Sequence, residues 1–321
     1  MFFRKEGTVL FAENLVMIAR QVLVLFILIA VGFACGKFGV ITEHASKKMT
    51  DIVLYVVTPC VMVNAFQREF SLELLGQIFL AAGIALAIMA VSIGLVKLVF
   101  HDKNESRKRV LQFAVIFSNC GFMSLPLQKA LLGEDGQFFG SIFVAIFNIV
   151  VWTYGLVSMS GDKKQLSLKK LALNPGIIGV TLAVILFVCH IDLPEVLDQS
   201  VKHLANLNTP LPMLIIGFYL SRADFKKAFS DAGVYISMAL RLIVVPVLAI
   251  FAMAPFGLNS KMVIAFVIAC AAPTAATTTM FSAKFNRDTE LSVSVVAAST
   301  LLSVITMPLV LSLAYTVCPV S

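Results

Sequence analysis

Long apolar runs separated by short polar segments fill almost the whole sequence. A helix needs about 20 apolar residues to cross the hydrocarbon core of a bilayer. The seventh run is the shortest of those found and contains Pro210 and Pro212. The pattern predicts ten membrane-spanning helices, at residues 15–36, 50–67, 73–99, 109–131, 137–159, 175–191, 207–221, 229–253, 260–282 and 290–316. The expected fold class is therefore an all-α integral membrane protein.

Composition agrees with this class. Of the 321 residues 59% are hydrophobic and only 13% are charged, and the mean hydropathy is +0.95. Soluble domains carry about 25% charged residues, so this chain has too few charges to cover a water-exposed surface. The net charge of +7 is a weak argument for a nucleic-acid partner, because the Lys and Arg residues cluster in the connections between apolar runs. We expect the partners to be the lipid bilayer and a small molecule, and no nucleic acid.

The connections alternate in positive charge. Those after the first, third, fifth, seventh and ninth helices carry 17 Lys and Arg, among them Lys170, Lys226 and Lys227, and the opposite side carries 6. The positive-inside rule assigns the richer side to the cytoplasm. This predicts a multi-pass protein of the cell membrane with both termini outside. The stretch 192–206 is then expected outside, as a short interfacial helix or loop.

Prolines suggest an internal repeat. Ten helices divide into two halves of five, and an odd number per half requires opposite insertion, which predicts an inverted repeat. Pro59 in the second helix matches Pro210 in the seventh at an offset of 151 residues, and Pro126 in the fourth matches Pro273 in the ninth at an offset of 147. Each proline taken alone could be a tolerated kink. Together they predict breaks in corresponding helices, with those of the fourth and ninth near the bilayer centre.

Two broken helices at the bilayer centre would create two new helix N-termini, each with a proline at its start. Such N-termini carry partial positive charge and free N–H groups, which suit an anion. Asn119 could instead satisfy freed backbone groups, Asn148 could join helices, and Arg241 could pair with a carbonyl or a helix C-terminus. The candidate substrate-binding residues are Ser118, Asn119, Gly121, Pro126, Asn148, Arg241, Pro273, Thr274, Thr277 and Thr278.

Other kinds of chemistry have little support. The six cysteines are scattered singly, the four histidines lie at helix ends or in connections, and no hydrolase or metalloprotease motif is present. We therefore expect neither an enzyme nor a cofactor or metal. No carboxylate lies deep in an apolar run, so a proton or sodium ion could couple transport but no carrier residue is evident. The inside-negative potential alone would drive a monovalent anion outward.

Several motifs resemble one family. They are "SNCGFMSLPL" in the fourth range, Asn148 four residues before "WTYG", "APTAATTTMFSAKF" followed by "TMPLVLSLAY", and "VGFACGKFGVITEHASKKMTDIVLYVVTPCVMVNAF" over the first two ranges. In order and spacing they resemble the auxin efflux carrier family, which includes plant PIN-type auxin exporters and bacterial malonate and malate transporters. The resemblance covers essentially the whole chain.

The resemblance implies an elevator-type carrier whose fourth and ninth helices cross beside the substrate. Residues 1–70 and 161–225 would form a scaffold of helices 1–2 and 6–7, and residues 71–160 and 226–321 a transport domain of helices 3–5 and 8–10. It also implies a homodimer through the scaffold. By position, Asn119 corresponds to the substrate-contacting crossover asparagine, and Asn148 stands where plant carriers have a glutamine. The long cytoplasmic loop of the plant carriers is missing here, which favours a small carboxylate over auxin.

The leading hypothesis is thus a secondary or potential-driven carrier of small organic anions. Two alternatives remain. A sodium-coupled bile-acid-type symporter shares the crossed-helix architecture and would need clustered oxygen ligands for sodium. A membrane receptor that binds an anion without moving it would have the same site and no flux.

Overall fold

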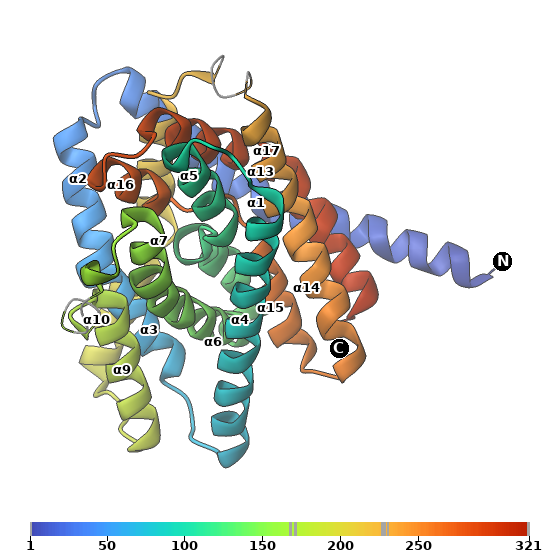
Figure 1. The fold of residues 1–321 in the computed structure, drawn as a ribbon. Coiled ribbons are helices and arrows are strands. Elements are labelled where there is room, and N and C mark those ends of the chain that lie inside the picture. Colours follow the sequence, from blue (N-terminus) through green and yellow to red (C-terminus); the bar gives the residue numbers. More distant parts are fainter. Residues whose placement is uncertain (1, 167–168, 170–171, 226–228, 230, 320–321) are drawn as a thin grey trace.

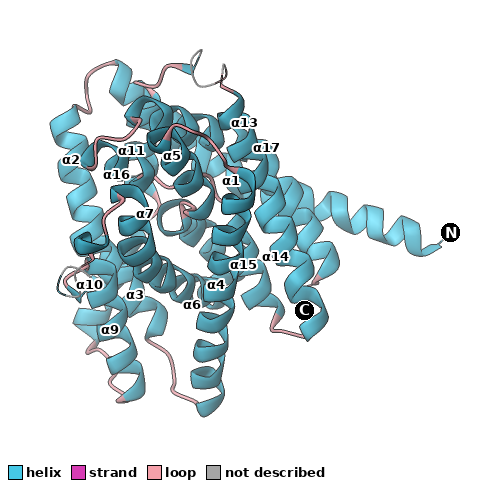
Figure 2. Ribbon diagram, viewed as in Figure 1, coloured by secondary structure: helices cyan, strands magenta, loops and turns pink. Residues whose placement is uncertain are grey.

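The computed structural model describes every residue except 1, 167–168, 170–171, 226–228, 230 and 320–321. Lys170, Lys226 and Lys227 of the predicted cytoplasmic connections therefore lie outside the described residues. The described chain is helical with no strand, and a single isolated β-bridge joins two helix interruptions (Figures 1 and 2). This confirms an all-α fold.

The N-terminal half follows the predicted ranges closely. Its helices are α1 (Phe2–Lys37), α2 (Glu43–Ile52), η1 (Val53–Val57), α3 (Thr58–Phe66), α4 (Leu72–Val99), α5 (Glu105–Ile116), η2 (Cys120–Ser124), α6 (Leu125–Val150), η3 (Val151–Gly155) and α7 (Leu156–Ser160). The segments α2, η1 and α3 form one continuous apolar helix, as do α6, η3 and α7 apart from one kink. The fourth predicted helix is interrupted between α5 and η2.

The C-terminal half has shorter elements. They are η4 (Lys163–Gln165), α9 (Pro175–Val188), α10 (Glu195–Asn206), α11 (Pro210–Leu220), α13 (Ala232–Ala239), η5 (Leu240–Val244), α14 (Val245–Met253), η6 (Ala254–Phe256), α15 (Ser260–Ala271), α16 (Thr277–Lys284) and α17 (Thr289–Val317). The helix α10 occupies the stretch 192–206 that was expected as an interfacial helix or loop. The ninth predicted helix is interrupted between α15 and α16.

Six helices in the described residues are long and apolar enough to cross a membrane, and α9 and α15 are shorter apolar helices. One of the six, Cys120–Ser160, is 41 residues long and covers the second half of the fourth predicted range and all of the fifth. Gly133 divides it, because its backbone has φ 66° and ψ −148°, a conformation that residues with a Cβ avoid. The run is therefore two helices joined at a glycine turn.

Three prolines follow a widened turn of helix. The π-helical segments η1, η2 and η5 each end two residues before a proline, at Pro59, Pro126 and Pro246. A proline ring normally clashes with the carbonyl four residues earlier, and a π turn adds one residue that moves this carbonyl away. The expected break at Pro59 is therefore wrong, since the second helix continues through it. Pro210 does coincide with a helix start, as the first residue of α11.

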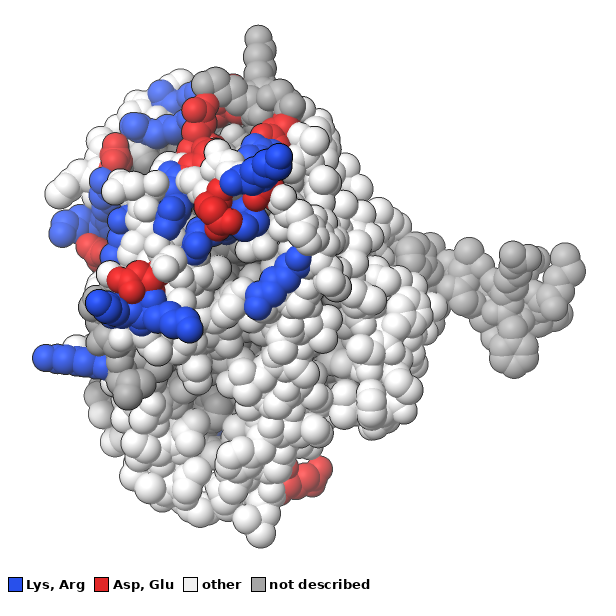
Figure 3. All heavy atoms as spheres, viewed as in Figure 1, with Lys and Arg blue, Asp and Glu red and all other residues white. Residues whose placement is uncertain are grey.

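The helices pack as a bundle in which distant segments are neighbours (Figure 1). The helix α1 packs against α11 and α17, α3 packs against α9 and α10, and α15 packs against α6. Charged side chains gather at the end of the molecule where α2, α5 and α16 lie, while the visible flank is almost free of charge (Figure 3). This distribution fits an apolar belt surrounded by lipid.

Side-chain caps mark where several helices begin. Asn104, Asn174, Asn259 and Asp231 each accept hydrogen bonds from two backbone N–H groups in the first turn of the following helix. These bonds satisfy donors that a helix start leaves free. Asp231 also receives two hydrogen bonds of 2.5 Å from Arg107, which joins the start of α13 to the start of α5.

We predict that Gly133→Ala lowers the melting temperature of the protein. No atom lies within 4 Å of a Cβ built at Gly133, so the cost arises from its positive φ alone and should reach about 1–3 kcal/mol. The control is Gly83→Ala in α4, which also has open space and an ordinary helical backbone. Thermal unfolding in detergent measures both. An unchanged melting temperature for Gly133→Ala would contradict the glycine turn.

A pH effect is expected at Asp231. Pairing with Arg107 holds the pKa of this carboxyl below its ordinary value. A lowered pKa stabilises the folded state above the unfolded-state pKa, about 3.9, and this contribution is lost as the pH falls through the folded-state pKa. Asp231→Asn should therefore melt lower than wild type at pH 7, with the difference shrinking below about pH 4. The exposed Glu69, changed to Gln, serves as control, and a difference that persists at low pH would exclude this explanation.

Candidate functional site

The two interrupted helices cross and pair through their backbones. The N–H of Asn119 donates to the carbonyl of Pro273 at 2.7 Å, and the N–H of Ala275 donates to the carbonyl of Phe117 at 2.9 Å. Between them Ser118 and Thr274 form an antiparallel β-bridge. Helix ends in an apolar interior leave backbone groups without partners. The bridge satisfies some of these groups, which is why both helices can be interrupted at the same place.

The structure corrects the position of one break. The fourth helix is interrupted at Phe117–Asn119, whereas Pro126 lies buried in the first turn of α6 after the π turn η2. Pro273 does lie in the break of the ninth helix, where its carbonyl accepts the Asn119 N–H, but α16 begins only at Thr277. The prediction that a proline starts each second half-helix at these breaks is therefore wrong. A proline inside a helix can be accommodated by a π turn, so it marks a break only approximately.

Arg241 lies where the two first half-helices end. Its guanidinium donates to the carbonyl of Val115 at 2.7 Å, to that of Ile116 at 3.2 Å and to that of Cys270. These carbonyls belong to the last turns of α5 and α15, whose C-termini carry partial negative charge. Arg241 is only 2% exposed. One buried cation therefore neutralises two helix ends, which is the C-terminus pairing that the sequence left open as an alternative.

The two second half-helices begin on the other side of the crossing. Because both C-termini are within reach of one guanidinium, the chains leave the crossing on the opposite side, where η2 and α16 start. Asn119 stands just before η2, is 7% exposed, and its side-chain amide makes no hydrogen bond in the described part of the chain. In the first turn of α16 the hydroxyls of Thr277 and Thr278 are buried and also lack a partner. Three polar side chains are thus unsatisfied beside two positively polarised helix starts.

Thr274 and Gly121 have partners within the protein. The hydroxyl of Thr274 donates to the Ala114 carbonyl at 3.0 Å, and its N–H donates to the Ser299 hydroxyl at 3.1 Å. Thr274 precedes α16, so it does not lie on the helix that carries Thr277 and Thr278. The carbonyl of Gly121 accepts a hydrogen bond of 3.4 Å from the amide of Asn208.

Asn148 lies farther along α6. Its amide donates to the Val144 carbonyl of its own helix at 2.9 Å. A Cβ built on Gly176 in the first turn of α9 would come within 2.7 Å of the same amide nitrogen. Asn148 therefore packs closely against α9, and Gly176 makes this approach possible.

Sequence reasoning missed three polar residues that hold the crossing in place. Asn208 binds Gly121 from the start of α11, Gln128 donates to the Ala265 carbonyl at 2.7 Å, and Ser124 donates to the Ile268 carbonyl at 3.3 Å. The last two bind α6 and η2 to α15. All three are isolated polar residues in apolar ranges. This isolation was the sequence feature that could have identified them.

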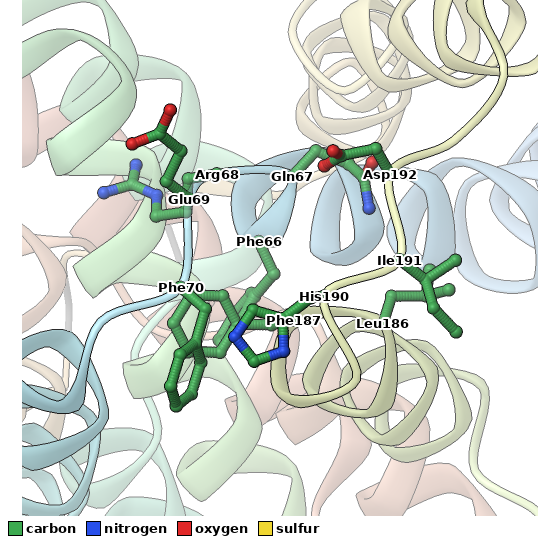
Figure 4. Close-up of a pocket in the computed structure, with 10 residues that line it drawn as sticks. All are labelled: Phe66, Gln67, Arg68, Glu69, Phe70, Leu186, Phe187, His190, Ile191 and Asp192. Atoms are coloured by element: carbon green, nitrogen blue, oxygen red, sulfur yellow. The ribbon is translucent and has the colours of Figure 1, made fainter.

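A cavity of about 280 Å³ lies away from the crossing, between the connection of α3 to α4 and the end of α9 (Figure 4). Its lining includes Phe66, Phe70, Phe187 and His190, and the rings of Phe70 and His190 are 4.5 Å apart. None of the candidate substrate-binding residues lines it. In the described residues no group of three or more His, Cys, Asp or Glu side chains could hold a metal ion.

Comparisons with known proteins identify relatives over most of the chain. The family model described as membrane transport protein matches residues 17–168 and 164–311. An uncharacterized transporter of Methanocaldococcus jannaschii is 26% identical over 241 residues, covering 71% of this chain and 76% of that protein. An uncharacterized transporter of Methanothermobacter thermautotrophicus is 22% identical over 299 residues, covering 90% and 96%.

Removing Arg241 should destabilise the crossing. Arg241→Ala leaves the carbonyls of Val115, Ile116 and Cys270 without this donor, at a cost of about 1–3 kcal/mol for each unsatisfied buried group. We expect a clearly lower melting temperature, with partial recovery in Arg241→Lys, which keeps the charge but not the planar donors. Arg20→Ala, at an exposed position on α1, is the matched control. A melting temperature of Arg241→Ala equal to that of the wild type would show that the two helix C-termini are stable without this cation.

Proposed function

Because this chain belongs to the membrane transport protein family, the auxin efflux carrier family indicated by its motifs, we propose that it carries small organic anions across the cell membrane. The observation behind this proposal is the charge arrangement of the crossing. Arg241 occupies the side where two helix C-termini meet, whereas in the described part of the chain neither η2 nor α16 has an acidic residue in its first turn or a side-chain cap. The proposed substrates are mono- or dicarboxylates of the size of malonate or malate.

Electrostatics favour an anion on the unoccupied side. Each helix N-terminus carries roughly half a positive charge in its first turn. Hydrogen bonds to a charged group contribute about 1.5–3 kcal/mol each, more than bonds between neutral groups. The unsatisfied groups there are an amide at Asn119 and hydroxyls at Thr277 and Thr278, all of which can donate to a carboxylate.

The tight packing favours a small substrate. Asn119 is 7% exposed and Thr278 is fully buried, so the crossing has little room beside these groups in this conformation. A short carboxylate with few atoms could be held by the donors of η2 and α16 after a modest opening. A bulky aromatic acid would require a much larger rearrangement.

Contacts across the bundle support movement of one group of helices against another. Arg107 joins α5 to α13, Arg109 donates to the Ser158 carbonyl of α7, and Arg287 donates to the carbonyls of Met159 and Ser160. All these bonds lie inside the proposed transport group, residues 71–160 and 226–321.

Side-chain hydrogen bonds that join this group to distant residues of the proposed scaffold, residues 1–70 and 161–225, are few in the described part of the chain. They come from Arg68, which binds Asp135 and the Glu134 carbonyl, and from Asn208, which binds Gly121 at 3.4 Å. The side chains of Arg68 and Asp135 are 19% and 41% exposed, and exposed ion pairs contribute only about 0–1 kcal/mol. This supports alternating access by an elevator-type displacement, and the homodimer through the scaffold is proposed from the family resemblance alone.

Flux measurements test the function directly. Liposomes that contain the protein and are loaded with radiolabelled acetate, lactate, malonate or malate should release the label faster than loaded liposomes without protein. An inside-negative potassium-diffusion potential should accelerate efflux of a monovalent anion, by up to about 2.3 kcal/mol of driving force per 100 mV. Imposed pH and sodium gradients identify a coupling ion. Specific binding without flux of any of these acids would favour the receptor.

Asn119 should be required for transport and dispensable for folding. Asn119→Ala removes an unpaired amide, so we expect transport to fall at least about tenfold, corresponding to about 1.4 kcal/mol, with normal insertion and melting. Asn119→Asp adds a negative charge beside the proposed site and should be more severe. Thr306→Val, which removes a hydroxyl bonded within α17, is the matched control. Normal flux in Asn119→Ala would show that the substrate does not bind at Asn119.

A further inference from the structure

Three polar residues lie along one face of α6. Gln137, Ser141 and Asn148 are separated by four and seven residues, which brings their side chains to nearly the same direction around the helix. Asn148 was a sequence candidate, whereas Gln137 and Ser141 were not. They extend the polar face from Asn148 toward the glycine turn at Gly133.

Gln137 and Ser141 are buried without hydrogen bonds. Gln137 is 3% exposed and Ser141 is fully buried, and their side-chain oxygens have no partner in the described part of the protein. Buried serines of α17 behave differently, since the hydroxyl of Ser303 donates to the Thr300 carbonyl of its own helix at 2.7 Å. A buried polar group without a partner is costly, and in a native structure such a group calls for an explanation.

Neighbouring residues define where this face points. On one side of it, Phe138 packs against Phe66 of α3 with ring centroids 5.0 Å apart. On the other side, the Val144 side chain lies 4.0 Å from the position that a Cβ on Gly121 would occupy. Asn148 meets Gly176 of α9. The face therefore borders η2 of the proposed transport group as well as α3 and α9 of the proposed scaffold, and so lies at the boundary between the two groups.

The end of this boundary near Gly133 is closed in the present conformation. Arg68, at the end of α3, donates to Asp135 at 3.1 Å and to the Glu134 carbonyl at 3.1 Å. Asp135 also accepts a hydrogen bond of 2.7 Å from Lys261 at the start of α15. Asp135 lies only two residues before Gln137, so these contacts and the Phe66–Phe138 pair cover the polar face from that end.

We infer that Gln137 and Ser141 form a second carboxylate-binding subsite, on a route between the crossing and the end of the molecule marked by Arg68 and Asp135. The amide of Gln137 and the hydroxyl of Ser141 donate to the carboxylate when the transport group moves and the boundary opens. In the closed conformation their side-chain oxygens have no hydrogen-bond partner among the described residues. This inference rests on the proposed function, because the same anion would visit both subsites.

Transport measurements on variants distinguish substrate binding by Gln137 and Ser141 from a purely structural role of these residues. Ser141→Ala and Gln137→Leu should each lower the ratio kcat/KM at least about fivefold, the loss expected for one hydrogen bond. The substrate is whichever of acetate, lactate, malonate or malate the wild type moves fastest. Melting temperatures should stay equal or rise, because an unpaired buried polar group is replaced by an apolar one. Ser303→Ala removes a buried, bonded serine hydroxyl elsewhere and should leave transport unchanged.

Labelling tests whether the route opens. Ser141→Cys in lipid nanodiscs is treated with a membrane-impermeant maleimide, and mass spectrometry reports modification at position 141. Both faces of a nanodisc are accessible, so the result does not depend on orientation. We expect modification at position 141 and none in Ser303→Cys, with slower labelling at saturating substrate.

The two proposals fail in different ways. Absence of carboxylate flux in the wild-type protein would overturn the proposed function and the subsite together. Wild-type flux combined with normal kcat/KM in both Ser141→Ala and Gln137→Leu, or with no modification of Ser141→Cys, would overturn the subsite alone.

Discussion

The structure depends on one constraint, namely that two helices stop and restart inside an apolar bundle. Each interruption frees N–H and carbonyl groups, and such groups are expensive to leave unpaired away from water. The protein satisfies them by placing the two interruptions together, so that Asn119 bonds to Pro273 and Ala275 bonds to Phe117. The remaining carbonyls of α5 and α15 are bound by Arg241. Neither interrupted helix could be placed in the bundle without the other.

This solution makes the crossing electrically asymmetric. Arg241 compensates the negative ends of α5 and α15, whereas the positive ends of η2 and α16 have neither an acidic residue in the first turn nor a side-chain cap among the described residues. Asn119, Thr277 and Thr278 stand at those ends with unused hydrogen-bonding capacity. The proposed anion-binding site thus follows from how backbone groups are satisfied, and it needs no positively charged side chain on the substrate side.

Two sets of the buried polar atoms that lack a hydrogen-bond partner in the described residues concern the proposed site and route. One lies at the start of α16 at the crossing, and the other lies on the face of α6 that carries Gln137 and Ser141. Both lie along or beside the boundary between the helices proposed to move and those proposed to stay. A carrier needs polar groups along a path that is closed in some conformations. In those conformations the polar groups are buried without partners, which lowers the stability of the protein. In the described residues only a few side-chain hydrogen bonds, those of Arg68 and Asn208, cross the boundary between distant parts of the chain, which agrees with such a design.

Much of the fold follows from the sequence alone, because membrane helices satisfy their own backbone bonds and require long apolar runs. Those runs determined the positions of the helices, and the family motifs determined which two of them are interrupted. The site was predicted less well. Pro126 suggested a break seven residues beyond Asn119, and only the tertiary structure decided that a π turn accommodates the proline and that the chain opens at Phe117–Asn119. It also decided which polar residues are used within the protein, as Arg241, Thr274 and Gln128 are, and which stay free, as Asn119 does. A linear pattern records which polar groups exist, whereas their partners come from helices far apart in the chain.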